Sequence, residues 1–436
     1  MIVEDLNNLR RTRRTSEITD KDTEVVLMGW VHETRDLGGV KFFLLRDREG
    51  TAQILFKKGK TTPELMEKFA KLGKEDVVAV KGMIQKNPKA PGGFEVLPSE
   101  LKILNQAEVL PLDVTGKTPA DFDTRLNARV VDLRRRNIGA IFRVRAEILI
   151  AARNYFELNG FFEIDTPRII ATATEGGAEL FPISYFNREA FLRQSPQIYK
   201  ELMTACFEQV YEIGPVFRAE PSDTTRHLAE ITQMDIEMGF ADETDTWKAL
   251  EGVIHEICKE VKANCSVELQ DLGVDIRVPE LPFKRISYTD MIKILQKAGL
   301  KLEWGDDIPP EAERKITELY TDPVIIYDYP MKMKPYYIHP HLDDPKLSYG
   351  FDLIMGGIEI SSGGRRIHDP ELYIKMIKEK GMNPDNFESV VKFFRWGMPP
   401  HAGWSVGIDR LTMILCGLKN VKEAVLFPRD VKRLTP

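Results

Sequence analysis

The chain has 436 residues, a length that suggests two or three domains. Its 61 Lys and Arg residues against 67 Asp and Glu residues give a formal net charge of −6, so any nucleic-acid surface must be local. Hydrophobic residues (43%) and charged residues (29%) occur in proportions that exclude a disordered or collagen-like chain.

The cysteine pattern and the apolar pattern both bear on the compartment. The four cysteines contain no CxxC pair, so the sequence predicts neither a zinc site nor a disulfide framework. No apolar run reaches the ~18 residues of a membrane span, and the first residues lack the apolar stretch of a secretory signal. We therefore expect a soluble protein of the cytoplasm.

The first 104 residues predict a small β domain. Five segments rich in β-branched and aromatic residues read as strands, and one helix follows the third, with Thr62 as its N-cap and Pro63 at its first position. Five strands with a helix after the third match an OB-fold barrel. Such barrels bind oligonucleotides or serve as structural inserts. The predicted strands are residues 23–32, 40–47, 51–56, 76–84 and 94–104.

A linker and a larger domain follow. Residues 105–131 are polar, contain Pro and Gly and show no sustained period, so we predict domains at 1–104 and 132–436 joined by this linker. The larger domain has amphipathic helices at about 138–159 and 244–264. Its strand-like segments are not separated by regular helices, which favours an α+β domain on an antiparallel sheet flanked by helices.

A predicted hairpin in the larger domain concentrates polar side chains. Its second strand, residues 231–240, places Gln233, Asp235 and Glu237 on one face. That face is either solvated or lines a polar site, and the alternation alone does not decide. Near the turn, the hairpin carries cationic side chains suited to phosphate, namely Arg218, Arg226 and His227.

Three segments in order resemble the signature motifs of the class II aminoacyl-tRNA synthetases. Residues 160–170, which include Pro167, resemble motif 1. Residues 217–220 and His227 resemble motif 2, and residues 403–415 resemble motif 3. With the N-terminal barrel, the resemblance is to the subgroup that charges aspartate, asparagine and lysine, and within it to the archaeal type of aspartyl-tRNA synthetase.

The resemblance implies ATP and Mg²⁺ as cofactors. The reaction brings two anions together and builds charge on phosphorus, so cations must stabilise it. By resemblance, Arg218 and Arg410 are catalytic, Arg218 on the α-phosphate and Arg410, with His227, on the distal phosphates. Ile231 stands where the family has an aromatic residue against adenine. The remaining ATP ligands implied are Glu220, Arg226 and Glu359, and the implied metal ligands are Asp352, Glu359 and Ser362.

The resemblance also implies which amino acid is the substrate, namely aspartate. A site for aspartate must pair the side-chain carboxylate with cations, and Lys200 and Arg366 match the residues that clamp it. Asparagine enzymes typically carry an acid at the position of Lys200. Asp235 corresponds to the residue that receives the ammonium group. The other implied aspartate ligands are Glu175, in a loop expected to close over the substrate, and Ser195, Gln197, Gln233 and Ser362.

The barrel carries the family pattern for the anticodon in Arg35, Phe42 and Gln53. Either Phe42 or Phe43 must face the barrel core, and we expect Phe42 to be the exposed one. His32 and Pro91 stand where aspartate-specific archaeal enzymes tend to have Trp and Lys. This pair resembles the non-discriminating form, which also places aspartate on tRNA(Asn).

The sequence therefore predicts an aspartate–tRNA ligase that acts on tRNA(Asp) and tRNA(Asn). Motif 1 builds the dimer interface in this class, so Pro167 in the matching segment implies a homodimer. Two alternatives remain: an asparaginyl-tRNA synthetase, and a non-catalytic RNA-binding protein derived from a synthetase.

Overall fold

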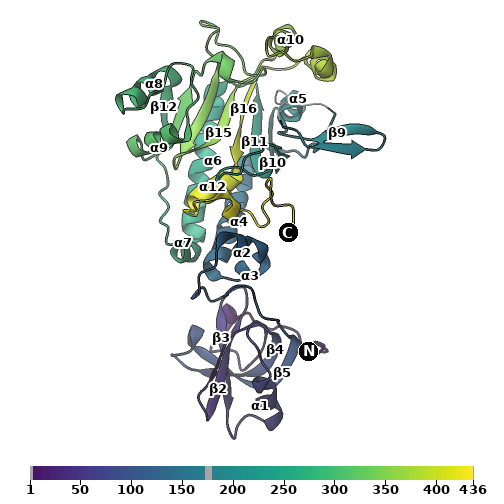
Figure 1. The fold of residues 1–436 in the computed structure, drawn as a ribbon, viewed down its shortest axis with the longest axis vertical. Coiled ribbons are helices and arrows are strands. Elements are labelled where there is room, and N and C mark those ends of the chain that lie inside the picture. Colours follow the sequence, from purple (N-terminus) through teal and green to yellow (C-terminus); the bar gives the residue numbers. More distant parts are fainter. Residues whose placement is uncertain (1–2, 172–178, 436) are drawn as a thin grey trace. The chain divides into compact units, whose positions relative to one another are not determined.

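The computed structural model describes residues 3–171 and 179–435. The chain forms two compact units, residues 1–135 and 136–436, each with its own core (Figure 1). Within the described ranges, every helix is too short or too polar to cross a bilayer.

The first unit contains a closed five-stranded barrel, in which the strands neighbour each other in the order β1-β2-β3-β5-β4. Helix α1 (Pro63–Ala70) lies between β3 and β4 in sequence, and its N-cap Thr62 accepts a hydrogen bond from the Leu65 amide at 3.3 Å. The predicted OB-fold is confirmed. The strands are β1 (Glu24–Asp36), β2 (Val40–Arg46), β3 (Thr51–Lys57), β4 (Val77–Lys86) and β5 (Phe94–Asn105).

Strand β2 shows how the alternation of side chains fills the barrel. Phe43 and Leu45 are fully buried in the core, whereas Phe42 is only partly buried on the opposite face of the strand. The Arg35 guanidinium lies 5.9 Å from the centre of the Phe42 ring. The expectation that Phe43 rather than Phe42 faces the core is confirmed.

The segment after the barrel is more ordered than the sequence indicated. The residues predicted as a linker, 105–131, include α2 (Phe122–Asn127) and most of α3 (Arg129–Asp132). Asp132 is buried and accepts hydrogen bonds from Arg125 at 3.3 Å and Arg129 at 3.1 Å. Helices of six and four residues are too short to show a period in sequence, which is why the sequence analysis missed them.

The second unit is built on an eight-stranded sheet with the order β12-β13-β14-β15-β16-β11-β10-β6. The six strands from β13 to β10 in this order pair antiparallel with one another, as predicted, and a parallel pair at each edge, β12–β13 and β10–β6, makes the sheet mixed. The strands are β6 (Phe162–Glu163), β10 (Gln209–Phe217), β11 (Glu230–Gly239), β12 (Lys284–Ser287), β13 (Val324–Tyr327), β14 (Gly350–Met355), β15 (Ile358–Arg365) and β16 (His401–Gly407).

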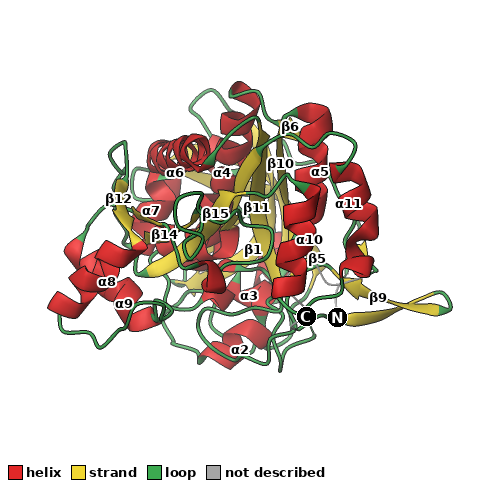
Figure 2. Cartoon of the chain, turned by 90° about the horizontal axis from the view of Figure 1, so that it is seen from above, coloured by secondary structure: helices red, strands yellow, loops and turns green. Residues whose placement is uncertain are grey.

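Helices flank this sheet. Phe156 of α4 stacks on Tyr211 of β10, with ring centres 4.6 Å apart, and α4 packs along α6 beside the sheet (Figures 1 and 2). The helices are α4 (Arg136–Leu158), α5 (Gln197–Phe207), α6 (Glu243–Asn264), α7 (Ser266–Leu272), α8 (Tyr288–Lys297), α9 (Pro310–Leu319), α10 (Pro370–Glu379), α11 (Glu388–Phe394) and α12 (Ile408–Leu415).

A second, three-stranded sheet has the order β7-β9-β8, with β7 (Ile169–Ile170), β8 (Pro182–Tyr185) and β9 (Arg188–Leu192). Its β8–β9 hairpin projects from the second unit in both views (Figures 1 and 2).

The two neighbouring phenylalanines of β2 provide a test of the barrel core. We expect Phe43→Ala to lower the free energy of unfolding of the barrel by about 3–5 kcal/mol, because it leaves a cavity in a closed core. Phe42→Ala, the matched control, should cost about 1 kcal/mol or less. Hydrogen exchange of the barrel amides in the full chain measures both. Equal costs would contradict the assignment of Phe43 to the core.

Candidate active site

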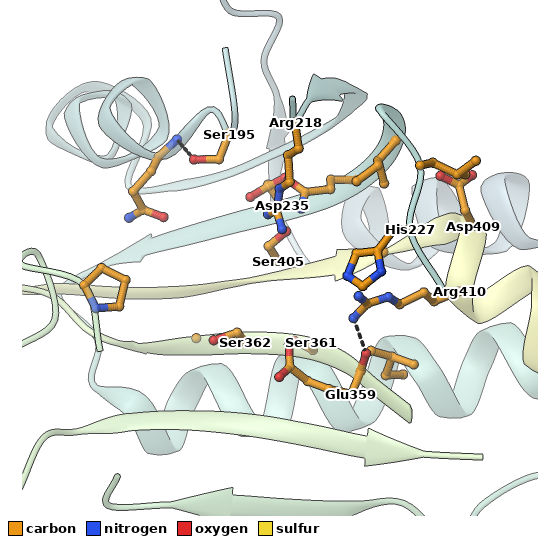
Figure 3. Close-up of a pocket in the computed structure, with 18 of the residues that line it drawn as sticks. Ser195, Arg218, His227, Asp235, Glu359, Ser361, Ser362, Ser405, Asp409 and Arg410 are labelled. Atoms are coloured by element: carbon orange, nitrogen blue, oxygen red, sulfur yellow. Dashed lines mark hydrogen bonds between the residues drawn. The ribbon is translucent and has the colours of Figure 1, made fainter. Parts of the chain in front are cut away.

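A cavity of about 330 Å³ opens over the central strands of the large sheet (Figure 3). The polar face of β11 lines it with Gln233 and Asp235, so this face belongs to a site and not to bulk solvent. Most of the catalytic, ATP and aspartate residues predicted from the sequence meet here. They are Ser195, Gln197, Lys200, Arg218, Glu220, Arg226, His227, Ile231, Gln233, Asp235, Glu359, Ser362, Arg366 and Arg410.

Two predicted site residues are not among the residues that line this cavity. Asp352 is buried on β14 and pairs in the strand register with Ser362, which does line the cavity. Glu175 lies outside the described residues, so its predicted contact with the substrate is not tested.

One end of the cavity is a buried cluster of four charges. Lys200 Nζ donates to Asp235 Oδ1 at 3.0 Å and lies 3.4 Å from Glu237 Oε2. Arg366 Nε donates to Glu237 Oε1 at 2.9 Å. All four side chains are 3% exposed or less. The cluster joins helix α5, strand β11 and the residue that follows β15.

The pKa values of the two carboxylates in this cluster, Asp235 and Glu237, shift in opposite directions. Burial raises the pKa of Asp235, and Lys200 opposes this only in part. Burial also disfavours the charged form of Glu237, but Arg366 and Lys200 outweigh it and hold the pKa of Glu237 below its ordinary value. Glu237 is therefore the permanent anion between the two cations. The alternation on β11 predicts Glu237 on this face, but no pattern in the sequence indicates its role.

Several buried acceptors at this end have no hydrogen-bond partner among the described residues. They include Asp235 Oδ2, Gln233 Oε1 and Ser405 Oγ. Gln197 donates its side-chain amide to Glu201 at 2.5 Å, which leaves its carbonyl oxygen as an acceptor. Unpaired buried acceptors are costly, so the chemistry of this end suits a ligand that brings N–H donors.

The other end of the cavity is cationic. Arg218, at the end of β10, makes no ion pair within the described residues and points into the cavity (Figure 3). Arg410 of α12 donates to the backbone oxygen of Glu359 at 2.8 Å. His227 Nδ1 lies 2.6 Å from Thr224 Oγ1, and its Nε2 lies 3.9 Å from Glu220. This geometry suits a polyanion such as a nucleotide phosphate chain.

Ion pairs with other segments of the chain hold the loop that connects β10 and β11. Arg226 pairs with Glu313 of α9 and donates to the Gly357 backbone oxygen at 3.2 Å. Lys422 joins Asp223 of the loop, at 2.8 Å, to Asp430, at 2.6 Å. Lys422 and Lys432 lower the pKa of Asp223 to about 2. Arg226 thus reaches the cavity while it is anchored to two other segments.

A buried ion pair sets the position of α12. Asp409 Oδ1 lies 2.6 Å from Arg145 of α4, and Asp409 Oδ2 accepts from the Thr232 amide of β11 at 2.9 Å. Burial raises the pKa of Asp409, and Arg145 opposes this rise. Because Asp409 precedes Arg410, these contacts aim the Arg410 side chain. No spacing in the sequence links Arg145 to Asp409, so this pair could not be predicted.

One of the predicted metal ligands, Asp352, already has a partner of its own. Lys334 Nζ donates to both oxygens of Asp352, at 2.6 and 2.7 Å, and is itself buried. Burial and the nearby Asp352 raise the pKa of Glu359 to about 7. No group of three or more His, Cys, Asp or Glu side chains in the described ranges could hold a metal ion. Lys334 gave no signal in the sequence.

Three of the predicted anticodon residues, Arg35, Phe42 and Gln53, share one face of the barrel strands β1–β3. Arg35 pairs with Phe42 in the strand register, and Gln53 pairs with Leu44, two residues further along β2. Gln53 donates to Glu95 at 3.2 Å. Pro91 begins the 3-10 turn Pro91–Gly93, which packs beside β3. His32 lies on β1.

Comparisons with known proteins agree with this geometry. A family model described as tRNA synthetases class II (D, K and N) matches residues 121–431, and one described as an OB-fold nucleic acid binding domain matches residues 25–104. The aspartate–tRNA(Asp/Asn) ligases of Methanococcus aeolicus and Methanocaldococcus jannaschii are each 48% identical to the chain. Their alignments cover 99% and 98%, respectively, of both proteins.

Solved structures of both aspartate and asparagine enzymes are similar. Asparaginyl-tRNA synthetase from Pyrococcus horikoshii, complexed with asparaginyl-adenylate, superposes with a TM-score of 0.93 at 32% identity, over 98% of this chain and 100% of that one. A putative aspartyl-tRNA synthetase from Leishmania major gives 0.89 at 28% identity, over 100% and 97%.

The raised pKa of Glu359 predicts a stability change with a definite pH dependence. The folded state holds this proton more tightly than the unfolded chain, so the associated stability is full below pH 4.5 and is lost as pH rises through about 7. Glu359→Gln should therefore raise the melting temperature by a few degrees at pH 8 and hardly at all at pH 5.

Thermal melts without nucleotide or metal measure this difference. Glu379→Gln, at an exposed position of α10, is the matched control and should change neither melting temperature. The same shift at both pH values for Glu359→Gln would contradict the prediction.

Proposed function

The chain belongs to the class II aminoacyl-tRNA synthetases of the aspartate, lysine and asparagine group, and we propose that it joins aspartate to both tRNA(Asp) and tRNA(Asn). The predicted resemblance to aspartyl-tRNA synthetases is confirmed by relatives that match over almost the whole chain. As a class II synthetase it uses ATP. The reaction forms aspartyl adenylate and then transfers the aspartyl group to the 3′ end of the tRNA.

The net charge of the buried cluster favours aspartate over asparagine as the substrate. Asp235, with an unpaired oxygen, receives the substrate ammonium group. Lys200, Arg366 and Glu237 then sum to one positive charge, which a side-chain carboxylate neutralises. The carboxamide of asparagine leaves that charge uncompensated in a buried site, so asparagine is rejected.

The cationic end of the cavity holds ATP. Arg218 has no competing partner among the described residues, so its guanidinium is available to the α-phosphate, where negative charge grows as the carboxylate attacks. Arg410 and His227 bind the distal phosphates. Glu220 meets the adenine base, against which Ile231 packs as an aliphatic surface.

The acidic residues beneath this end fit one Mg²⁺ held together with the nucleotide. Glu359 and Ser362 line the cavity and offer hard oxygen ligands, and a bound cation would oppose the burial and the Asp352 charge that raise the pKa of Glu359. Bound Mg²⁺ would neutralise phosphate charge. Both oxygens of Asp352 accept from Lys334, so its predicted role as a ligand requires that this pair open.

The barrel binds the anticodon. Phe42 offers a partly exposed ring on which a base can stack, and Arg35 and Gln53 flank it on the same face. His32 and Pro91 stand in place of the Trp and Lys that tend to restrict aspartate-specific enzymes to tRNA(Asp).

We further propose a homodimer in the cytoplasm. Phe162 of the motif 1 segment stacks on Phe207, with ring centres 4.4 Å apart, although each remains about half exposed. An exposed aromatic pair beside the motif 1 segment suits an interface with a second copy. Sedimentation of the purified chain tests this assembly.

Two rival functions make different predictions. An asparaginyl-tRNA synthetase would exchange pyrophosphate into ATP faster with asparagine than with aspartate. A non-catalytic RNA-binding protein would exchange it with neither. We expect exchange that depends on aspartate, followed by charging of both purified tRNAs. Preference for asparagine, or no exchange, would overturn the proposal.

Lys200→Met tests the charge balance. We expect it to lower kcat/KM for aspartate by roughly 10³-fold or more in pyrophosphate exchange, because the substrate carboxylate loses its partner and two buried carboxylates lose a cation. The matched control is Lys248→Met, at a position 70% exposed on α6, which should leave the rate unchanged. Equal rates for the two variants would remove Lys200 from the substrate site.

The double variant His32→Trp with Pro91→Lys tests the tRNA assignment. We expect it to keep full charging of tRNA(Asp) and to lose at least about tenfold in charging of tRNA(Asn), since a bulky ring and a fixed cation restrict the accepted base. Charging of both tRNAs with labelled aspartate measures this. Equal charging by the double variant would contradict the role of these two positions.

A further inference from the structure

His32 occupies an irregular position on β1. Val31 pairs with Leu45 and Glu33 with Leu44, so His32 is an extra residue with no partner on β2. Such a β-bulge redirects a side chain relative to the regular strand. The His32 side chain is 21% exposed, so a ligand can reach it.

Backbone contacts from the turn before β4 fix this bulge. The Glu75 amide donates to the Val31 oxygen at 2.6 Å, and the Val31 amide donates to the Asp76 oxygen at 2.9 Å. Glu75 has a φ of 68°, in the left-handed region that residues other than glycine rarely adopt. A buried residue keeps such a conformation only where its surroundings impose it, and function is a frequent reason.

The Glu75 side chain holds Arg46, the cation next to His32. Its carboxylate accepts two hydrogen bonds from Arg46, at 2.7 and 2.8 Å, and one from Arg134 at 3.0 Å. Arg46 Nη1 also lies 3.0 Å from His32 Nδ1. Glu75 is 1% exposed, so these contacts are protected from water.

This geometry selects one form of the imidazole. A guanidinium has only donors, so Nδ1 of His32 must accept from Arg46, and the ring proton must lie on Nε2. Burial and the Arg46 charge lower the pKa of His32, which keeps the ring neutral. His32 therefore offers an N–H donor, and not a lone pair, on the side away from Arg46.

We propose that Glu75 is a positioning residue for tRNA recognition, which acts through Arg46 to hold His32 as an Nε2–H donor to O2 of the third anticodon base. The inference rests on the proposed function, which assigns His32 to that base. By the genetic code this base is C in tRNA(Asp) and U in tRNA(Asn). Both pyrimidines carry O2, and they differ at N3 and at position 4.

The fixed donor explains relaxed recognition in chemical terms. An N–H donor to O2 treats C and U alike. The other tautomer would present a lone pair, which accepts from the amino group of C or from N3–H of U and so can separate them. Glu75 thereby selects the tautomer that does not discriminate.

Base substitution in the tRNA tests the donor in the unmodified protein. We expect 2-thiouridine at the third anticodon position of tRNA(Asn) to lower kcat/KM for charging about tenfold, because sulfur is a weak acceptor. The matched control, 4-thiouridine, makes the same atomic change at position 4 and should cost less than about twofold. Equal losses for the two bases, or a larger loss with 4-thiouridine, would overturn the proposal.

Glu75→Gln tests the positioning role. It should lower kcat/KM for both unmodified tRNAs about tenfold, through KM, and reduce the 2-thiouridine penalty to less than about threefold. Pyrophosphate exchange without tRNA should not change. The matched control is Glu24→Gln, which removes an exposed carboxylate on β1, the strand that carries His32, 3.1 Å from Lys81, and should behave as the unmodified protein does. A full 2-thiouridine penalty in Glu75→Gln would overturn the role of Glu75.

Two further measurements distinguish a failure of this inference from a folding defect of the variant and from a failure of the proposed function. If Glu75→Gln does not fold, Arg46→Lys replaces it, because one ammonium cannot serve both the carboxylate and the imidazole as the guanidinium does. If the unmodified protein charges only tRNA(Asp), the proposed function fails. In that case, a comparison of kcat/KM for charging of tRNA(Asp) with cytidine or 2-thiocytidine at the third anticodon position still decides whether His32 donates to O2.

Discussion

The buried contact of Lys200 and Arg366 with Glu237 is the constraint on which the site depends. These charges come from α5, β11 and the end of β15, so the pocket exists only when all three elements are in register. Removing one partner would strand another charge away from water, at a cost of about 3–5 kcal/mol. The arrangement that we propose for the selection of aspartate therefore also holds the centre of the sheet together.

Features with a local cause could be predicted from the sequence. The alternation along β2 separates Phe43 from Phe42, because consecutive side chains point to opposite faces of a strand. The alternation along β11 placed Gln233, Asp235 and Glu237 on one face, and the structure shows that this face lines the cavity. The order of the three motifs was enough for the family and for most residues of the site.

Features that arise from contacts between distant segments could not be predicted. Lys334 is 18 residues from Asp352, and nothing in either segment shows that they pair. Arg145 and Asp409 are separated by most of the second unit. The bulge at His32 depends on a turn more than forty residues away, and a bulge leaves no pattern in a single strand. Two short helices in the predicted linker were missed because they complete too few turns to show a period.

The large sequence separation within the cavity also has a consequence during protein synthesis. The barrel strands come from one continuous stretch and can pair soon after they leave the ribosome. The cavity is lined by both Arg218 and Arg410, which are almost two hundred positions apart. A nascent chain can therefore carry a finished RNA-binding module long before it gains a working catalytic centre, and in that interval it can occupy tRNA without being able to aminoacylate it.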